Sequence, residues 1–299
     1  MPMHDDEVAS DPGLVRELVA AQFPRLADLP VTAGPAGGTD HRLFRLGAEF
    51  LVRMPKVAWA ADQATSDWRW LPRLAPHLPV AVPAPLAVGE PGLGYPFRWS
   101  VVPWLPGRPP TPSGDDPIAV ATQLGGFVAA LRAVAPADGP LKADDARGGL
   151  LGCRDEEVVR AIEECGDRID QRAVLRVWRD AVSAAPPAVR SWIHGDLLPG
   201  NMLVDDGRLT GVIDWGAVGV GDSAVDLWPA WTHGWDDGAR GAFREIATDG
   251  MADVDDAWQR ARGWVVVMCA VAIPYYWETF PEFARASQER LAGLVTTES

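Results

Sequence analysis

The sequence predicts an α+β protein with a small, strand-rich N-terminal lobe and a larger, mainly helical C-terminal lobe. Short alternating or apolar runs, typical of strands, are concentrated before residue 105. A segment dense in Pro, Gly and Ser follows at 105–117 and is typical of a linker. Beyond it, apolar residues recur at helical spacing, and one hairpin at 202–213 interrupts them. We therefore expect two domains, 1–105 and 106–299.

The N-terminal lobe is expected to alternate helices with strand pairs. In chain order, the expected elements are a helix at 12–23, strands at 41–47 and 49–55, a helix at 58–78, and strands at 85–88 and 97–104. The second helix would be interrupted near Pro72, which cannot donate a backbone hydrogen bond. Its predicted apolar face consists of Trp68, Leu71, Leu74 and Leu78.

The C-terminal lobe is expected to begin with a helix that Asp116 caps and that has Pro117 at its first position. Similar helical patterns follow at 155–164, 170–184, 222–233, 239–248, 254–279 and 282–295. The apolar run at 263–277 is shorter than the roughly 20 residues that cross a bilayer, so it predicts a buried core helix.

Charge and cysteine content restrict the partners. The formal net charge of −14, from 41 acidic and 27 basic residues, repels nucleic acid and anionic membranes. A cationic small molecule suits this charge, although an acidic surface also serves solubility alone. The three cysteines show no C-x-x-C spacing, and the N-terminus lacks a signal-peptide pattern. These features favour a cytoplasmic protein, which we expect to be a monomer or weak dimer.

Polar residues flank the hairpin in the stretch WIHGDLLPGNMLVDDGRLTGVIDWG at 192–216. Asp206-Gly207 predicts a tight turn between the two apolar runs. Asn201 precedes the first strand and Asp214 follows the second, so the fold brings both to one end, offset by about 7 Å along the strand. Amide and carboxylate oxygens are ligands that Mg²⁺ prefers alongside phosphates.

Two further polar residues precede the hairpin. Asp196 lies on the loop that enters the same end, where it could accept a proton from a hydroxyl nucleophile. A lone Asn or Asp beside a turn is more often a cap than a ligand, but three at this spacing favour a functional site. His194, between Ile193 and Gly195, is interpreted as a histidine that braces the loop.

These residues resemble a known pattern. HGDLLPGN followed by IDWG is similar to the catalytic loop and metal-binding motif of the aminoglycoside phosphotransferase family, antibiotic kinases related to protein kinases. The resemblance implies a protein-kinase-like bilobal fold and transfer of the γ-phosphoryl group from ATP or GTP. Asp196 would be the catalytic base, and Asn201 and Asp214 would hold Mg²⁺. In GVGDSAVDL, Asp222 and Asp226 would brace the catalytic loop.

The same resemblance implies a nucleotide site in the N-terminal lobe. Backbone amides of Gly37, Gly38 and Thr39 would face phosphate oxygens. The family's phosphate-pairing cation falls at Arg53, with Lys56 as the alternative, and its acidic partner on the following helix falls at Asp67. Pro103 and Leu105 occupy the hinge that would meet adenine; Pro103 offers only a carbonyl, so Leu105 is the expected donor.

The sequence does not distinguish between two classes of substrate. Carboxylates and aromatic residues at 228–237 and 275–282 suit either an aminoglycoside or a macrolide, and aromatic stripes are also typical of a helical core. The expected enzyme is therefore a small-molecule O-phosphotransferase that acts on an antibiotic. One alternative is a metabolic kinase of the choline, homoserine or sugar type. Another is an inactive nucleotide-binding regulator, against which the complete set of Asp196, Asn201 and Asp214 argues.

Overall fold

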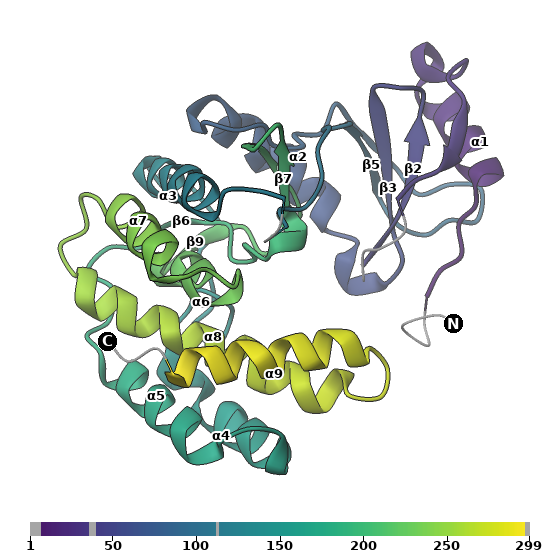
Figure 1. The fold of residues 1–299 in the computed structure, drawn as a ribbon. Helices are drawn as coiled ribbons and strands as arrows, with labels where there is room; N and C mark the ends of the chain where they lie inside the picture. The colour runs from purple at the N-terminus through teal and green to yellow at the C-terminus, as the bar shows by residue number, and fades with distance from the viewer. Residues whose placement is uncertain (1–6, 36–39, 112–113, 297–299) are drawn as a thin grey trace. The chain divides into compact units, whose positions relative to one another are not determined.

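The computed structural model describes residues 7–35, 40–111 and 114–296. Within these residues the chain forms two compact units (Figure 1). The N-terminal unit runs to Pro76 and takes in Ala81–Pro106 and Gly211–Gly216, and the C-terminal unit contains His77–Val80, Gly107–Thr210 and the chain from Ala217. The first is built on one antiparallel sheet and the second is mainly helical, so the predicted α+β class is confirmed.

The sheet of the N-terminal unit has five strands in the order β1-β2-β3-β5-β4, and every neighbouring pair is antiparallel. The strands are β1 (Val31–Ala33), β2 (His41–Leu46), β3 (Phe50–Pro55), β4 (Ala87–Gly89) and β5 (Trp99–Pro103). Phe44 of β2 lies opposite Val52 of β3, which lies opposite Val101 of β5. The predicted hairpin of β2 and β3 is therefore present.

The two faces of this sheet have different chemistry. Helix α1 (Pro12–Gln22), capped by Asp11, packs Val15 and Leu18 against a core that includes Val52 and Met54. Because side chains alternate along a strand, Arg53 must point to the opposite face. That alternation is the reason a charged residue can lie in the middle of a buried apolar strand.

Helix α2 (Gln63–Leu74) buries a face different from the one predicted. Its buried residues are Ala64, Asp67, Trp70, Leu71 and Leu74. Trp68, predicted to be buried, is 50% exposed, so that prediction was wrong. Ala64, Asp67 and Leu71 follow one another at helical spacing, so a carboxylate lies in the middle of the buried apolar face. A prediction that counts only apolar residues cannot identify such a buried carboxylate.

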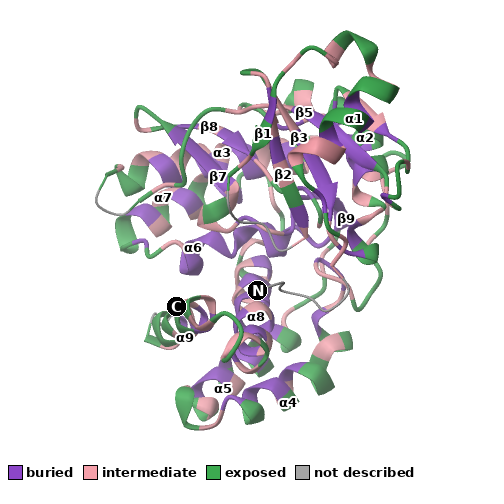
Figure 2. Cartoon of the chain, turned by 90° about the vertical axis from the view of Figure 1, so that its right-hand side faces the viewer, coloured by how far each residue is buried: buried purple, intermediate pink, exposed green. Residues whose placement is uncertain are grey.

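The C-terminal unit is organised around one long helix, α8. Its helices are α3 (Pro117–Ala133), α4 (Asp155–Glu164), α5 (Gln171–Ser183), α6 (Pro229–Thr232), α7 (Asp237–Ala247), α8 (Val254–Tyr276) and α9 (Pro281–Thr296). Helix α8 contacts α4, α5 and α9, and much of it is buried (Figure 2). The apolar run at 263–277 is thus a core helix, and no described helix is long and apolar enough to span a membrane.

Two small sheets complete the fold, and the sequence analysis found only one of them. The hairpin joins β7 (Met202–Asp205) to β8 (Arg208–Val212). Its turn has positive φ at both Asp206 (48°) and Gly207 (72°), as the Asp-Gly signal predicted. The second sheet pairs β6 (Ser191–Ile193) with β9 (Gly219–Gly221) and was missed, because strands of three residues carry no readable alternation.

The segment after β9 is also less regular than predicted. Instead of one helix over 222–233, a 3₁₀ turn spans Ser223–Leu227 and α6 follows as a single turn. The Asp222 side chain accepts from the backbone N–H of Ala224 at 3.0 Å, a local bond that competes with regular helical bonding.

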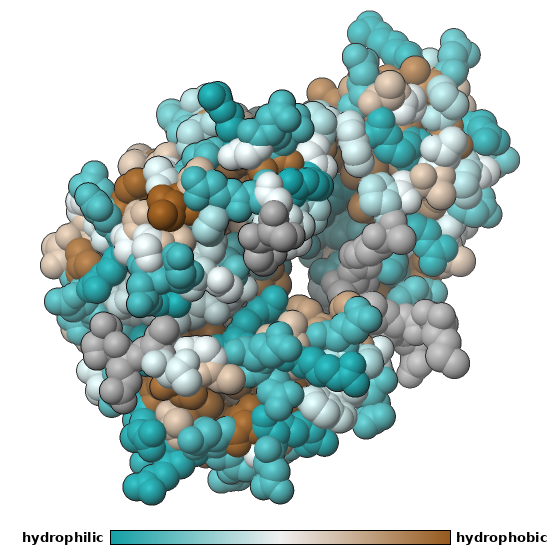
Figure 3. Space-filling view, in the orientation of Figure 1, coloured by the Kyte–Doolittle hydropathy of each residue, from teal (hydrophilic) through white to brown (hydrophobic). Residues whose placement is uncertain are grey.

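The surface visible in Figure 3 is mostly hydrophilic, with small separate apolar areas. Large exposed apolar residues, such as Trp59, Leu141, Val189 and Tyr275, are scattered along the described chain. Singly exposed residues of this kind are ordinary for a globular protein. Figure 3 therefore gives no reason to propose a large apolar docking surface on this face.

Candidate active site

Asp196 and Asn201 are joined directly in the loop between β6 and β7. The Asn201 Nδ2 group donates to the Asp196 carbonyl at 2.8 Å and to its Oδ2 at 3.0 Å. Backbone bonds from Leu198 N to the Asp196 carbonyl and from Asn201 N to the Leu198 carbonyl close the loop. Since the amide nitrogen faces Asp196, its oxygen is the atom left to meet a cation.

Asp226 binds the start of this loop through backbone hydrogen bonds. Its carboxylate accepts from the backbone N–H of His194 and of Gly195, each at 2.7 Å. Burial raises the pKa of Asp226 to about 7, although the two N–H donors act in the opposite direction. Gly195 has φ of 77°, where a side chain would be strained, which explains why glycine stands at this position.

His194 has the loop-bracing position that the sequence predicted. The residue is fully buried, and its Nδ1 accepts a hydrogen bond from the Asp196 backbone N–H at 3.1 Å. An accepting Nδ1 carries no proton, so this bond fixes the tautomer of the ring. His194 thus orients Asp196 through the backbone.

Asp222 ties the brace to helix α8. Arg260 donates from Nε to Asp222 Oδ2 at 2.8 Å and from Nη2 to Asp222 Oδ1 at 3.2 Å, and Nη2 also reaches Asp253 at 2.9 Å. Asp222 in turn caps the 3₁₀ turn through the N–H of Ala224. The segment that carries Asp226 is therefore anchored in the helical core.

Arg53 and Asp67 form a buried ion pair in the N-terminal unit. Arg53 Nη1 lies 2.8 Å from Asp67 Oδ2, and the two side chains are 10% and 1% exposed. Burial raises the pKa of Asp67 to about 6, against the effect of Arg53, and the charge of Asp214 raises it further. The shorter Asp side chain thus reaches the cation, and the cation that pairs with Asp67 is Arg53.

Gln63 adds a connection that the sequence analysis missed. With its amide oxygen turned toward the two nearby donors, it accepts from Arg53 Nη2 at 2.9 Å and from the backbone N–H of Gly216 at 3.0 Å. Gly216 ends the Asp-Trp-Gly sequence that begins at Asp214. The position of Gln63 one helical turn before Asp67 could have indicated that the two share a face.

Asp214 itself adopts an unusual backbone conformation. Its φ is 61°, in the left-handed region that non-glycine residues seldom enter. The next residue, Trp215, is fully buried and donates from its indole nitrogen to the Val212 carbonyl at 3.0 Å. A buried anchor beside a strained, exposed carboxylate is typical of a functional position.

Pro103 and Leu105 lie at and just beyond the end of β5. Pro103 is paired with Phe50 in the sheet, and Trp104 donates to the Glu49 carbonyl. The Leu105 N–H donates to no other group in the described part of the chain, which suits the expected donor to a base. Gly37, Gly38 and Thr39 lie outside the described residues.

The structure thus brings the candidate residues together in two sets. Arg53, Asp67 and Gln63 form one set in the N-terminal unit, where Gln63 also binds the end of the segment that carries Asp214. Asp196 and Asn201 form the other in the C-terminal unit. Arg147 joins this second set at 2.6 Å from Asp196 and was not anticipated, because nothing in the local sequence marks it.

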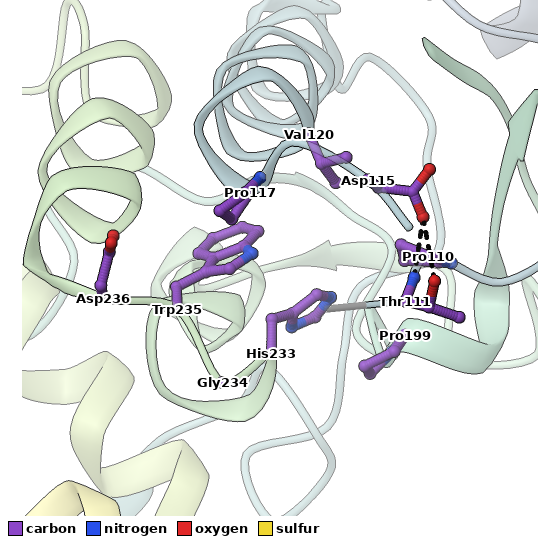
Figure 4. A pocket seen from close by; sticks show the side chains of 10 residues that line it. All are labelled: Pro110, Thr111, Asp115, Pro117, Val120, Pro199, His233, Gly234, Trp235 and Asp236. Carbon is purple, nitrogen blue, oxygen red and sulfur yellow. Dashed lines mark hydrogen bonds between the residues drawn. The ribbon is translucent and has the colours of Figure 1, made fainter. Parts of the chain in front are cut away.

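A pocket of about 250 Å³ adjoins the catalytic loop within the C-terminal unit (Figure 4). Pro199 of the loop lines it together with Trp235, His233 and the start of α3. Burial lowers the pKa of His233 to about 3, so its ring is neutral. The two carboxylates of the pocket are already engaged, because Asp115 binds Arg108 and Asp236 caps α7.

The antiparallel sheet and the mainly helical unit form a kinase-like fold. Solved structures with the same fold include a GDP and kanamycin complex of an aminoglycoside phosphotransferase, with 18% identity, a TM-score of 0.73, and coverage of 94% of this chain and 98% of that one. Another is a macrolide 2′-phosphotransferase from Brachybacterium faecium, with 23% identity, a TM-score of 0.61 and coverage of 97% and 99%.

The family itself follows from the sequence match. Residues 32–264 match the model of the phosphotransferase enzyme family, and the chain belongs to that family. A curated relative, streptomycin 6-kinase of Streptomyces glaucescens, is 35% identical over 127 residues, which cover 42% of this chain. The match spans only 39% of that kinase's length.

Proposed function

We propose that this enzyme transfers the γ-phosphoryl group of ATP or GTP to a hydroxyl group of a small-molecule antibiotic of aminoglycoside or macrolide type. The observation that carries the proposal is the Asp196–Asn201 hydrogen bond, in a loop that Asp226 holds through two backbone N–H groups. A carboxylate fixed in this way is positioned to accept a proton from an incoming hydroxyl.

In the proposed step, one bond forms and one bond breaks at the γ-phosphorus. The acceptor oxygen forms a bond to the γ-phosphorus, and the bond between that phosphorus and the β–γ bridging oxygen breaks. The proton of the hydroxyl goes to Asp196 and then to solvent, and the nucleoside diphosphate carries away the negative charge. Positioning and charge neutralisation supply most of the acceleration in such a transfer.

The nucleotide is assigned to the N-terminal unit. Arg53, held by Asp67 and Gln63, would bind phosphate oxygens, and the Leu105 N–H and the Pro103 carbonyl would meet the base. Gly37, Gly38 and Thr39 stay predicted phosphate contacts.

Mg²⁺ is assigned to Asn201 and Asp214. The amide oxygen of Asn201 and the exposed carboxylate of Asp214 are hard ligands that suit this ion. Mg²⁺ in such sites takes its other ligands from substrate phosphates and water. When bound, Mg²⁺ would neutralise charge that develops on the phosphates.

The acceptor is assigned to an antibiotic because the relatives act on such compounds. Structures with this fold include both aminoglycoside and macrolide phosphotransferases, and the partial match is to a streptomycin kinase. The net charge of −14 suits a cationic acceptor, whereas the pocket beside Pro199 has an aromatic and proline-rich lining. A metabolic kinase is the alternative that the same catalytic residues would serve.

A direct test incubates the protein with Mg²⁺, ATP or GTP, and a panel of aminoglycosides, macrolides, choline and homoserine, followed by mass spectrometry. We expect a gain of one phosphoryl group on an antibiotic. Asp196→Asn should abolish that product while nucleotide binding, measured by calorimetry, persists. Full activity of the variant would refute the role of Asp196, and a phosphorylated metabolite alone would favour the alternative. A wild-type protein that binds no nucleotide in the presence of Mg²⁺ would refute the kinase function.

A further inference from the structure

Arg147 makes a close ion pair with the side chain of Asp196. Its Nη1 lies 2.6 Å from Asp196 Oδ1 and also donates to the Gly195 carbonyl at 3.1 Å. Asn201 meanwhile donates to the other oxygen, Oδ2. The carboxylate is thus held from two sides, with Arg147 at one oxygen and Asn201 at the other.

The turn that carries Arg147 is compact. Its backbone bonds run from Ala146 N to Ala143 O at 3.0 Å, from Gly149 N to Ala146 O at 2.8 Å and from Leu150 N to Asp144 O at 2.7 Å. These bonds satisfy the backbone groups of the turn locally. The guanidinium therefore projects from a defined backbone and not from a long flexible loop.

The same turn is pressed against the strand that leads into the catalytic loop. Gly148 has φ of 82°, and a Cβ there would stand 2.2 Å from the Ile193 Cδ1 atom. Its carbonyl accepts from the Asp222 N–H at 2.7 Å. The positive φ favours glycine at this position, and the close approach keeps the turn beside β6.

An ordinary surface ion pair would explain the contact less well. The Arg147 and Asp196 side chains are 30% and 21% exposed, whereas Arg190 and its partner Asp144, which lies on the same turn as Arg147, are 37% and 58% exposed. Exposed pairs contribute little to stability. Arg147 is the less exposed cation, and its partner is the residue assigned as catalytic base.

We propose that Arg147 is a positioning residue for phosphoryl transfer, which orients the Asp196 carboxylate toward the attacking oxygen. This inference rests on the proposed function. A misplacement of about 1 Å can cost on the order of 10²-fold in rate, so the loss of this contact should act mainly on kcat.

The test uses Mg²⁺ with ATP or GTP and water as acceptor, and it measures phosphate release, so no antibiotic needs to be known. Arg147→Ala should lower kcat by about 100-fold and change the nucleotide KM by less than about threefold. Guanidinium ion, added well below denaturing concentrations, should restore part of the rate. Arg190→Ala is the matched control, and it should retain wild-type kcat and show no response to guanidinium.

The outcomes separate the inference from the function on which it rests. A wild-type protein that binds no nucleotide contradicts the proposed function, and one that binds without hydrolysis contradicts the inference. Wild-type kcat in Arg147→Ala, or a loss that guanidinium leaves unchanged, overturns the role of Arg147. If thermal unfolding shows that Arg147→Ala does not fold, Arg147→Lys and Arg147→Gln replace it. Lys should then retain more activity than Gln, and equal activities would overturn the inference.

Discussion

Arg53 and Asp67 are oppositely charged residues that are both buried. The 2.8 Å contact to Asp67 Oδ2 offsets part of the cost of burying both groups, and Asp67 Oδ1 accepts no hydrogen bond among the described residues. Removing one partner of such a pair leaves a buried charge uncompensated, which costs about 3–5 kcal/mol. The pair therefore controls the stability of the N-terminal unit, and under the proposed function it would also present a cation to nucleotide phosphates.

Arg53→Met is predicted to lower the free energy of unfolding by about 3 kcal/mol, because it leaves Asp67 buried without a cation. Arg53→Met with Asp67→Leu should recover most of that loss, since both charges are then absent. Urea denaturation followed by tryptophan fluorescence measures both changes. Nucleotide binding should stay impaired in the double variant. A single variant as unstable as the double one would mean that the pair has no coupling energy.

Both residues were predicted from the family resemblance. Arg53 falls in the run FLVRMP, at the position of the family's phosphate-pairing cation. Asp67 was found through family resemblance, while the periodicity of its helix pointed to Trp68 as part of the buried face, and Trp68 is half exposed. The Asp67 carboxylate can be buried because a cation on another element pairs with it. The sequence of the helix alone does not indicate that partner.

At the scale of elements, Gln63 connects helix α2 to the segment that follows β8. The segment Gly211–Gly216 belongs to the N-terminal unit, where Val212 N is bonded to the Ala81 carbonyl at 3.0 Å and Gly216 N to Gln63. Asp214 lies between these two attachments. Its strained backbone is therefore held on both sides, which is how such a conformation persists.

Gln63→Leu is predicted to reduce kcat by about tenfold and the free energy of unfolding by about 1–2 kcal/mol, because two donors lose their acceptor. Gln63→Glu should keep near wild-type activity, since a carboxylate accepts from both. The matched control is Gln22→Leu, because Gln22 bonds to both backbone groups of Glu90 in the same unit. Steady-state kinetics distinguish the variants, and equal kcat values for Gln63→Leu and Gln22→Leu would contradict this role.

Elements with a local signal were predicted well, and those that depend on distant contacts were not. The hairpin turn follows from Asp206-Gly207, and helices such as α4 were predicted with their observed bounds. The three-residue strands β6 and β9 exist only because they pair with each other. Arg147 stands 49 residues before Asp196, and a turn packed on β6 creates their contact.

At the scale of the whole molecule, the acidic composition includes carboxyl groups that are buried, among them Asp67 and Asp226. Burial raises the pKa of Asp67 to about 6 and that of Asp226 to about 7. A group whose pKa is higher in the folded state than in the unfolded state binds its proton more tightly when folded. The stability that it contributes is full below its unfolded pKa and is lost as pH rises through the folded value.

The raised pKa of Asp226 predicts how the stability of the protein changes with pH. Wild-type stability should fall, relative to Asp226→Asn, as pH rises from about 4 to about 7, by at most about 1.4 kcal/mol per pH unit. Asn is less stable throughout, because its NH₂ group would face one of the N–H donors of His194 and Gly195. The gap between the two proteins should thus be widest near pH 4 and narrowest above pH 7. Urea midpoints across this range measure it; a gap that widens with pH would mean that the two N–H donors outweigh burial and that Asp226 is ionised throughout.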